Sequence, residues 1–149
     1  MRRTETERKY DLPAEFSLPD LTGIGGSGRL DGPAVHRLSA TYYDTPTLTL
    51  ARHGITLRRR TGGTDAGWHL KRPAGRWRRT EIHAPLRPGR IVVPAAFDPE
   101  LAALRRGREL EPVAKLTTRR TEWTLVGADG SPLALIADDR VTVHRPDRE

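Results

Sequence analysis

Residues 55–83 read ITLRRRTGGTDAGWHLKRPAGRWRRTEIH, and the pattern within them decides the fold. Three runs, 55–61, 67–72 and 76–83, have the composition and alternation of strands. Turn residues separate them: Gly, Thr and Asp after the first run, and Pro, Ala and Gly after the second. Turns this short join antiparallel neighbours. The stretch therefore predicts three consecutive antiparallel strands.

The flanking sequence extends this sheet. Alternating or apolar runs recur before and after it, and Ala128-Asp129-Gly130 is a hairpin turn between the last two. Antiparallel strands with tight turns suit a barrel or a curved sheet, so the expected class is α+β, mostly antiparallel β, with about seven strands. The additional strands are expected at 4–11, 30–44, 113–126 and 133–143.

Two short helices are expected to flank the sheet. One is predicted at 48–51, ended by Gly54. The other is predicted at 94–106, because Asp98 can be its N-cap, Pro99 suits the first helical position and Gly107 stops it.

The composition of the chain limits which classes of partner it can have. It has 149 residues, which suits one domain, and 26 Lys and Arg against 19 Asp and Glu leave a net charge of +7. A basic balance favours a polyanionic partner. The chain has no Cys, no apolar run approaching 18 residues and no signal-like N-terminus, so a soluble cytoplasmic protein without a membrane partner is expected.

The sequence Glu5-Thr6-Glu7-Arg8-Lys9 alternates two acids and a Lys near the start. On a strand, alternate side chains share a face, so Glu5, Glu7 and Lys9 are expected to point one way. Carboxylates suit a hard divalent cation, and the ammonium suits a phosphate. The pattern is also compatible with a solvated polar edge strand.

Cations recur at matching positions of later strands. Between Arg52 and Arg79 the chain has nine Lys and Arg and one acid, Asp65. The pairs predicted to share a strand face are Arg58 with Arg60, His69 with Lys71, Arg79 with Glu81, and Thr118 with Arg120.

Two arrangements explain these faces. A basic sheet facing solvent would bind RNA or DNA and leave the core to the opposite apolar residues. A closed barrel would enclose the cations, which would repel one another unless carboxylates or a bound anion neutralised them. Glu5, Glu7, Glu81 and Asp139 can supply the carboxylates. Such a lumen fits a linear chain of phosphates, which Arg binds through two parallel bonds.

The residues resemble the ordered signature of the CYTH domain, the triphosphate tunnel metalloenzyme superfamily. The resemblance covers nearly the whole chain and suggests one domain over residues 1–149, similar to bacterial CYTH proteins that are often fused to a helical CHAD domain. Its motifs are Glu5-x-Glu7-x-Lys9, Tyr42-Tyr43-Asp44-Thr45-Pro46, Gly54-Ile55-Thr56-Leu57-Arg58-Arg59-Arg60, Trp68-His69-Leu70-Lys71 and Arg79-x-Glu81.

This resemblance implies an antiparallel eight-stranded tunnel lined by charge. It implies metal binding by Glu5 and Glu7. It places Glu81 among the acids near the metals or those that order the basic residues. Asp139 is similar to an Asp on a late strand of the family. The residues that it implies for gripping the triphosphate are Lys9, Arg58, Arg60, Lys71, Arg79 and Arg120.

The sequence departs from the family at its end. Family members usually finish with a strand that carries a Glu-x-Glu pair, whereas this sequence ends Arg145-Pro-Asp-Arg-Glu149. We therefore expect about seven of the eight strands, with the last acidic strand missing. An unpaired barrel edge favours a homodimer or strand exchange between two copies.

The expected function is Mg²⁺- or Mn²⁺-dependent hydrolysis of a triphosphate, inorganic triphosphate first, with Glu5, Glu7 and Glu81 as the catalytic acids. Covalent catalysis has no support, because Cys and a Gly-x-Ser-x-Gly motif are absent. The five His residues show no metal-ligand spacing, and His69 is expected to be a hydrogen-bond partner or an ordinary strand residue. The alternatives are a polyphosphate- or nucleotide-binding module without turnover and, less favoured, a nucleic-acid-binding domain.

Overall fold

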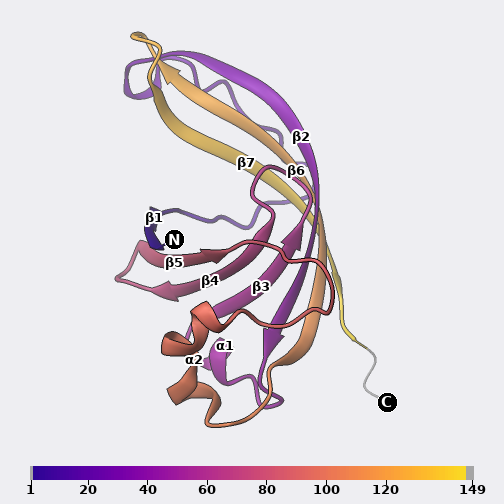
Figure 1. Cartoon of the computed structure of the whole chain (residues 1–149). Helices are drawn as coiled ribbons and strands as arrows, with labels where there is room; N and C mark the ends of the chain where they lie inside the picture. The colour runs from indigo at the N-terminus through magenta and orange to yellow at the C-terminus, as the bar shows by residue number, and fades with distance from the viewer. Residues whose placement is uncertain (1, 147–149) are drawn as a thin grey trace. The chain divides into compact units, whose positions relative to one another are not determined.

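The computed structural model describes residues 2–146, apart from the side chains of residues 3 and 5. Strands dominate, and the helical segments are short, which confirms the α+β class (Figure 1). The elements in chain order are β1 (Arg2–Thr6), η1 (Ile24–Gly26), β2 (Ser27–Asp44), α1 (Thr49–Arg52), β3 (Thr56–Thr61), β4 (Gly67–Pro73), β5 (Arg78–Ala84), η2 (Ala95–Phe97), α2 (Asp98–Arg105), β6 (Glu111–Gly127) and β7 (Pro132–His144).

The strands form one seven-stranded sheet in the order β1-β5-β4-β3-β2-β6-β7. The pairs β1–β5, β5–β4, β4–β3 and β3–β2 are antiparallel, and the short turns of the sequence predicted this for β3–β4 and β4–β5. β1 and β7 end this order, and no pairing joins them in the part of the chain that the structure describes, so the sheet is not closed into the expected barrel. Association through these edges stays a prediction.

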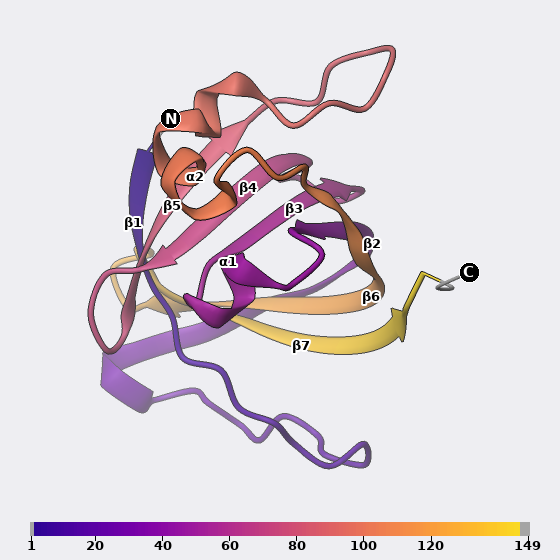
Figure 2. The ribbon, with the colours of Figure 1, turned by 90° about the horizontal axis from the view of Figure 1, so that it is seen from below.

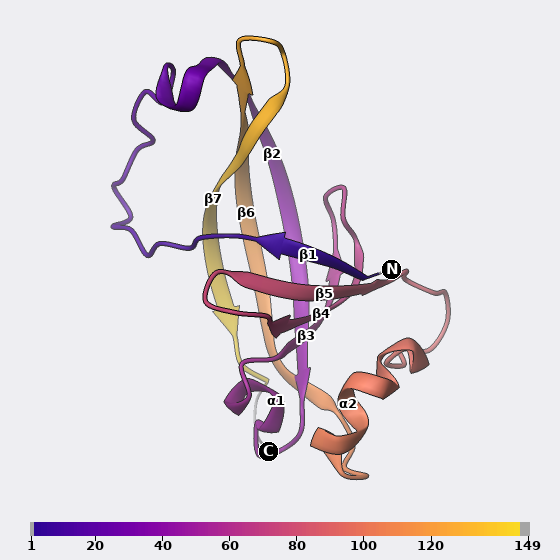
Figure 3. The same cartoon turned by 90° about the vertical axis from the view of Figure 1, so that its left-hand side faces the viewer.

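The chain divides into two compact units. The first contains residues 2–8, 38–117 and 142–146, and the second contains residues 9–37 and 118–141. β2, β6 and β7 contribute residues to both units. In the first unit, β1 lies beside β5, followed by β4 and β3 (Figure 3).

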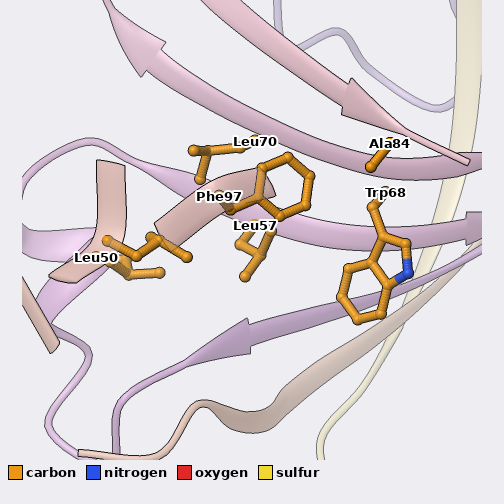
Figure 4. Packing of buried hydrophobic residues seen from close by; sticks show 7 residues of the cluster. Leu50, Leu57, Trp68, Leu70, Ala84 and Phe97 are labelled. Atoms are coloured by element: carbon orange, nitrogen blue, oxygen red, sulfur yellow. The ribbon is translucent and has the colours of Figure 1, made fainter. Parts of the chain in front are cut away.

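One face of the first unit's strands packs against the helical segments. Figure 2 shows α1 and α2 next to each other and over β3 and β4. Leu57 and Leu70 are paired across β3 and β4, and Leu70 is paired with Ile82 of β5, so alternation directs these apolar side chains to the same face. Figure 4 shows much of the resulting cluster, whose buried members are Leu50, Leu57, Trp68, Leu70, Ala84, Phe97 and Leu101.

α1 is fixed by a buried carboxylate at its start. Asp44, only 3% exposed, accepts hydrogen bonds from the backbone N–H groups of Thr45, Leu50 and Ala51, at 2.7, 2.9 and 3.0 Å. Because the first N–H groups of a helix have no partner within it, this side chain replaces the missing acceptors. Asp44 therefore has a structural role at the start of α1.

Several predicted boundaries shift by a few residues, and two of these shifts change the role of a named residue. α2 begins at Asp98, with Phe97 as the N-cap residue, so Asp98 is helical and lies in the first turn, where its negative charge favours the helix dipole. β1 ends at Thr6 rather than at residue 11. Glu7 and Lys9 therefore follow the strand, and their alternation with Glu5 on one strand face is not formed.

Candidate functional site

The second face of β3, β4 and β5 carries charge. His69 is paired with Arg58 on one side and with His83 on the other, and Lys71 is paired with Glu81. These residues alternate with Leu57, Leu70 and Ile82, so they occupy the face opposite to α1 and α2. The sheet register thus brings together side chains that lie up to 25 positions apart in the sequence.

Lys71 is the centre of an ion-pair chain on this face. Its Nζ lies 3.7 Å from Glu81 Oε2 and 3.9 Å from Glu7 Oε2. Glu7 Oε1 is in turn 3.6 Å from Arg79 Nε. Anions and cations therefore alternate, which removes much of the repulsion that Lys71 and Arg79 would otherwise experience. All three distances exceed those of ordinary charged hydrogen bonds, so these pairs are held loosely.

A buried His supports Glu81 from the other side. Glu81 is 1% exposed and His69 is 0% exposed, and His69 Nδ1 lies 2.6 Å from Glu81 Oε1. His69 Nε2 lies 2.9 Å from the backbone oxygen of Asp65. Because a carbonyl oxygen only accepts, Nε2 carries the proton of this bond. The bond between Nδ1 and Glu81 Oε1 needs a second proton, on one of its two atoms. His69 therefore fixes one oxygen of Glu81 and leaves the other directed to Lys71.

Arg60 and Arg58 have different surroundings on this face. Arg60 is 6% exposed and donates from Nε and one terminal nitrogen to the backbone oxygen of Asp65, at 3.3 and 3.0 Å. The same terminal nitrogen is 3.1 Å from Asp65 Oδ2. Arg58 is partly buried, and its Nε has no hydrogen-bond partner among the described residues. Arg60 is thus bound to the β3–β4 turn, whereas Arg58 keeps a buried N–H donor for another acceptor.

The second unit contains its own charged cluster. Arg120 of β6 donates two parallel hydrogen bonds of 2.7 Å to the carboxylate of Asp139 in β7. Glu122 lies 3.8 Å from Arg120 and 3.4 Å from Nε2 of His36. The bidentate bond occupies both oxygens of Asp139, so its predicted metal role would require Arg120 to move away.

The structure brings together four of the predicted site residues, Glu7, Lys71, Arg79 and Glu81, and places Arg58 on the same face. Lys9 lies beyond β1 and is exposed, because the strand ends three residues earlier. The side chain of Glu5 lies outside the described residues, although its backbone is paired with that of Arg79.

Sequence reasoning missed Asp65 and His83. Asp65 is the acid in the turn between β3 and β4, and His83 follows Arg79 and Glu81 at the same two-residue spacing. Extending that alternation by one step would have placed His83 on the charged face. The contact of Asp65 with Arg60 had no comparable signal, because it depends on the path of the turn.

The chain is similar to a known domain family and to two mycobacterial proteins. The CYTH domain family matches residues 3–144. Two proteins of Mycobacterium tuberculosis, uncharacterized protein MT2285 of strain CDC 1551 / Oshkosh and uncharacterized protein Rv2226 of strain H37Rv, are each 45% identical to this chain over 141 residues. The alignments cover 95% of this chain and 28% of each relative, so the chain corresponds to a minor part of these longer proteins.

Within residues 2–146 no helix is long and apolar enough to cross a membrane. The matched region contains β2 to β7 in full and β1 from residue 3. CYTH proteins form the triphosphate tunnel family, which includes metal-dependent triphosphatases and generally uses divalent metals. The chain belongs to the CYTH family.

Proposed function

We propose that this chain binds the phosphates of inorganic triphosphate on the charged face of the first unit and hydrolyses them with Mg²⁺ or Mn²⁺. The observation that carries the proposal is the Lys71 network. An ammonium 12% exposed lies between two carboxylates at 3.7 and 3.9 Å, with Arg79 next in the chain of charges. This arrangement combines cations for phosphate oxygens with acids for a metal in one place.

The residues present fit a hard divalent cation. Glu7 and Glu81 provide only oxygen donors, which Mg²⁺ and Mn²⁺ prefer, and Glu5 is the third acid proposed for this group. Asp139, for which the sequence predicted a metal role, binds Arg120 within the second unit. When bound, the cation would neutralise phosphate charge and align the attacking water.

The long ion-pair distances suggest how the phosphates are received. Lys71 gives up little when it leaves Glu7 and Glu81, because its distances to them are those of loose pairs. A phosphate oxygen would replace those carboxylates as its partner, which would leave Glu7 and Glu81 to hold the cation. Arg58 and Arg79 would hold neighbouring phosphates through their guanidinium groups. Arg60, bound to Asp65, would support the turn unless it exchanges that partner for phosphate.

Nucleic acid is a weaker candidate for this face. Glu7 and Glu81 lie among the cations and would repel a phosphodiester backbone unless a metal intervened. A binding module without turnover uses the same contacts as the proposed enzyme, so the distinction rests on whether phosphate is released.

The experiment compares two adjacent basic residues on opposite faces. Lys71 lies in the network, whereas Arg72 Nε lies 3.3 Å from Glu100 on the helical face. Phosphate release from inorganic triphosphate is measured with Mg²⁺, Mn²⁺ or EDTA for the wild type, Lys71→Met and Arg72→Met, and titration calorimetry gives the affinity. Thiamine and nucleoside triphosphates extend the panel.

We expect metal-dependent release that Lys71→Met reduces by about 100-fold or more, by analogy with the loss of one charge-stabilising group, while Arg72→Met stays within about twofold. Tight binding without release by the wild type would select the binding module. Binding of RNA that needs no Mg²⁺ and falls steeply with salt would select the nucleic-acid surface. Equal losses in both variants would refute the assignment to this face.

A further inference from the structure

Three side chains at the β3–β4 turn form a cluster that the proposed triphosphate site does not use. Asp65 comes from the turn, His69 from β4 and His83 from β5, and one ligand atom from each lies within 4.8 Å of the others. His69 and His83 are directly paired across the two strands, and their ring centroids are 4.8 Å apart. We propose that these residues bind a borderline transition metal such as Zn²⁺ or Co²⁺, at a site separate from the oxygen-ligand site for Mg²⁺ or Mn²⁺.

The donor set determines the class of metal. Two imidazoles and one carboxylate suit Zn²⁺, Co²⁺ or Ni²⁺, whereas Mg²⁺ prefers oxygen ligands alone. Metal–ligand bonds of about 2.0–2.2 Å separate tetrahedral ligands by about 3.3–3.6 Å. The donors of the cluster must therefore approach one another by about an ångström. Asp65 and His83 are partly exposed, at 42% and 34%, so their rotamers can supply this movement.

Glu81 gives His69 the support that metal-binding His residues usually have. The Nδ1 of such a His commonly donates to a carboxylate, which orients the ring and directs the other nitrogen to the metal. His69 Nδ1 is 2.6 Å from Glu81 Oε1, and Nε2 faces Asp65, at 2.9 Å from its backbone oxygen. A metal on Nε2 would replace that carbonyl without turning the buried ring, but the carboxylate of Asp65, whose Oδ2 lies 3.9 Å from Nδ1, would have to move to the Nε2 side.

Two neighbours shape the rest of the cluster. Arg60 contacts Asp65 Oδ2 at 3.1 Å, whereas Oδ1 is the oxygen nearer to His83, at 4.0 Å from Nε2. Arg60 therefore orients the carboxylate, although its positive charge also weakens cation binding. Gly67 lies under the His83 ring: a Cβ at this position would come within 2.4 Å of His83 Nε2. The lack of a side chain at Gly67 makes room for the His83 ring beside His69.

The two sites share Glu81 through different oxygens. Oε1 contacts His69 and Oε2 lies nearest to Lys71, so a metal on His69 would be felt at the phosphate-binding Lys through one carboxylate. The transition-metal site itself needs no triphosphate. Its test can therefore succeed or fail independently of the proposed hydrolysis.

The experiment titrates the whole chain with Co²⁺, followed by its absorption bands, and with Zn²⁺ by calorimetry, both in excess Mg²⁺ and without phosphate. The variants are His83→Ala, Gly67→Ala and Glu81→Gln. His53→Ala is the matched control, because His53 is exposed and its side chain has one described hydrogen bond, to the α1 backbone oxygen of Thr49. Circular dichroism of each metal-free variant checks folding.

We expect one metal equivalent per chain, with tetrahedral Co²⁺ bands. Glu81→Gln should weaken binding by about 10- to 100-fold, and His83→Ala by more, because it removes a ligand. Gly67→Ala should weaken binding as well, whereas His53→Ala should bind as the wild type does. Zn²⁺ should shift the side-chain ¹⁵N resonances of His69 and His83 but not that of His53. Binding unaffected by His83→Ala, or shifts confined to other His residues, would overturn the proposal.

Discussion

The two faces of β3, β4 and β5 have the same backbone and opposite chemistry. Leu57 and Leu70 enter a dry cluster under α1 and α2, while their immediate neighbours Arg58 and Lys71 join the charged face. Burial of apolar surface stabilises the first face. On the second face, desolvation of charge opposes ion pairing, so its net contribution to stability is small. Stability and ligand binding should therefore be separable by substitutions one residue apart.

The largest effect on stability is expected on the apolar face. Leu70 is 1% exposed and packs within the cluster, so Leu70→Ala removes buried methyl groups and leaves a cavity. We expect a loss of about 2–5 kcal/mol in the free energy of unfolding, measured by urea denaturation.

Lys71→Met is the matched change on the other face and should alter the unfolding midpoint far less. Triphosphate affinity of the Leu70→Ala protein, measured below its unfolding midpoint, should stay near that of the wild type. If Lys71→Met destabilised the fold as much as Leu70→Ala, the division of roles between the faces would be wrong.

The fold class, the turns, and the apolar and charged faces of β3, β4 and β5 could be predicted from the sequence. Alternation within 55–83 was sufficient to assign residues to these faces. Once the turns are known, the antiparallel register follows, and it puts Arg58, His69 and Lys71 on one face. Alternation failed at Glu5-x-Glu7-x-Lys9, because nothing in those five residues shows that pairing with β5 stops at Thr6. The contacts of Arg60 with the turn and of Arg120 with Asp139 also depend on tertiary geometry that spacing alone does not contain.

A second comparison uses Arg58 and Arg59. Arg58 has a buried Nε without a partner among the described residues, on the charged face, whereas Arg59 is paired with Thr41 and Trp68 on the helical side. Arg58→Ala should weaken triphosphate binding by about tenfold or more, since one charge-assisted contact is lost, and Arg59→Ala should change it little. Calorimetry measures both affinities.

Arg59→Ala has a different expected signature, at Tyr43. Burial raises the pKa of Tyr43, and the positive charge of Arg59 partly offsets this. Removing that charge should raise the Tyr43 pKa further, which an ultraviolet titration of the phenol would detect. A raised folded-state pKa means that the stability linked to Tyr43 is present at neutral pH and is lost as the pH rises through that pKa. An unchanged Tyr43 titration would contradict the placement of Arg59 on this face.

The smallest effect on stability is expected at the exposed turn between β6 and β7. There a carboxylate accepts a backbone N–H bond, as Asp44 does, but without being buried. Asp129, between β6 and β7, accepts hydrogen bonds from the hydroxyl and backbone N–H of Ser131, at 2.6 and 3.0 Å, and these bonds lower its pKa. Ser131→Ala removes the hydroxyl, which is the larger cause, so the Asp129 pKa should return toward 3.8. Carboxyl ¹³C titration by NMR measures the change.

The sign of the linked stability follows from the lowered pKa. In the wild type the contribution of Asp129 is present above the unfolded-state pKa and is lost as the pH falls through the folded-state value, and Ser131→Ala should shrink that acid dependence. Asp20, whose pKa is lowered by Thr22 in the same way, should titrate unchanged and is the internal control. Because both carboxylates are fully exposed, the effect on unfolding should be slight compared with that of Leu70→Ala. A large loss would mean that hydrogen bonding to a carboxylate, rather than burial beside the helices, governs the stability of the sheet.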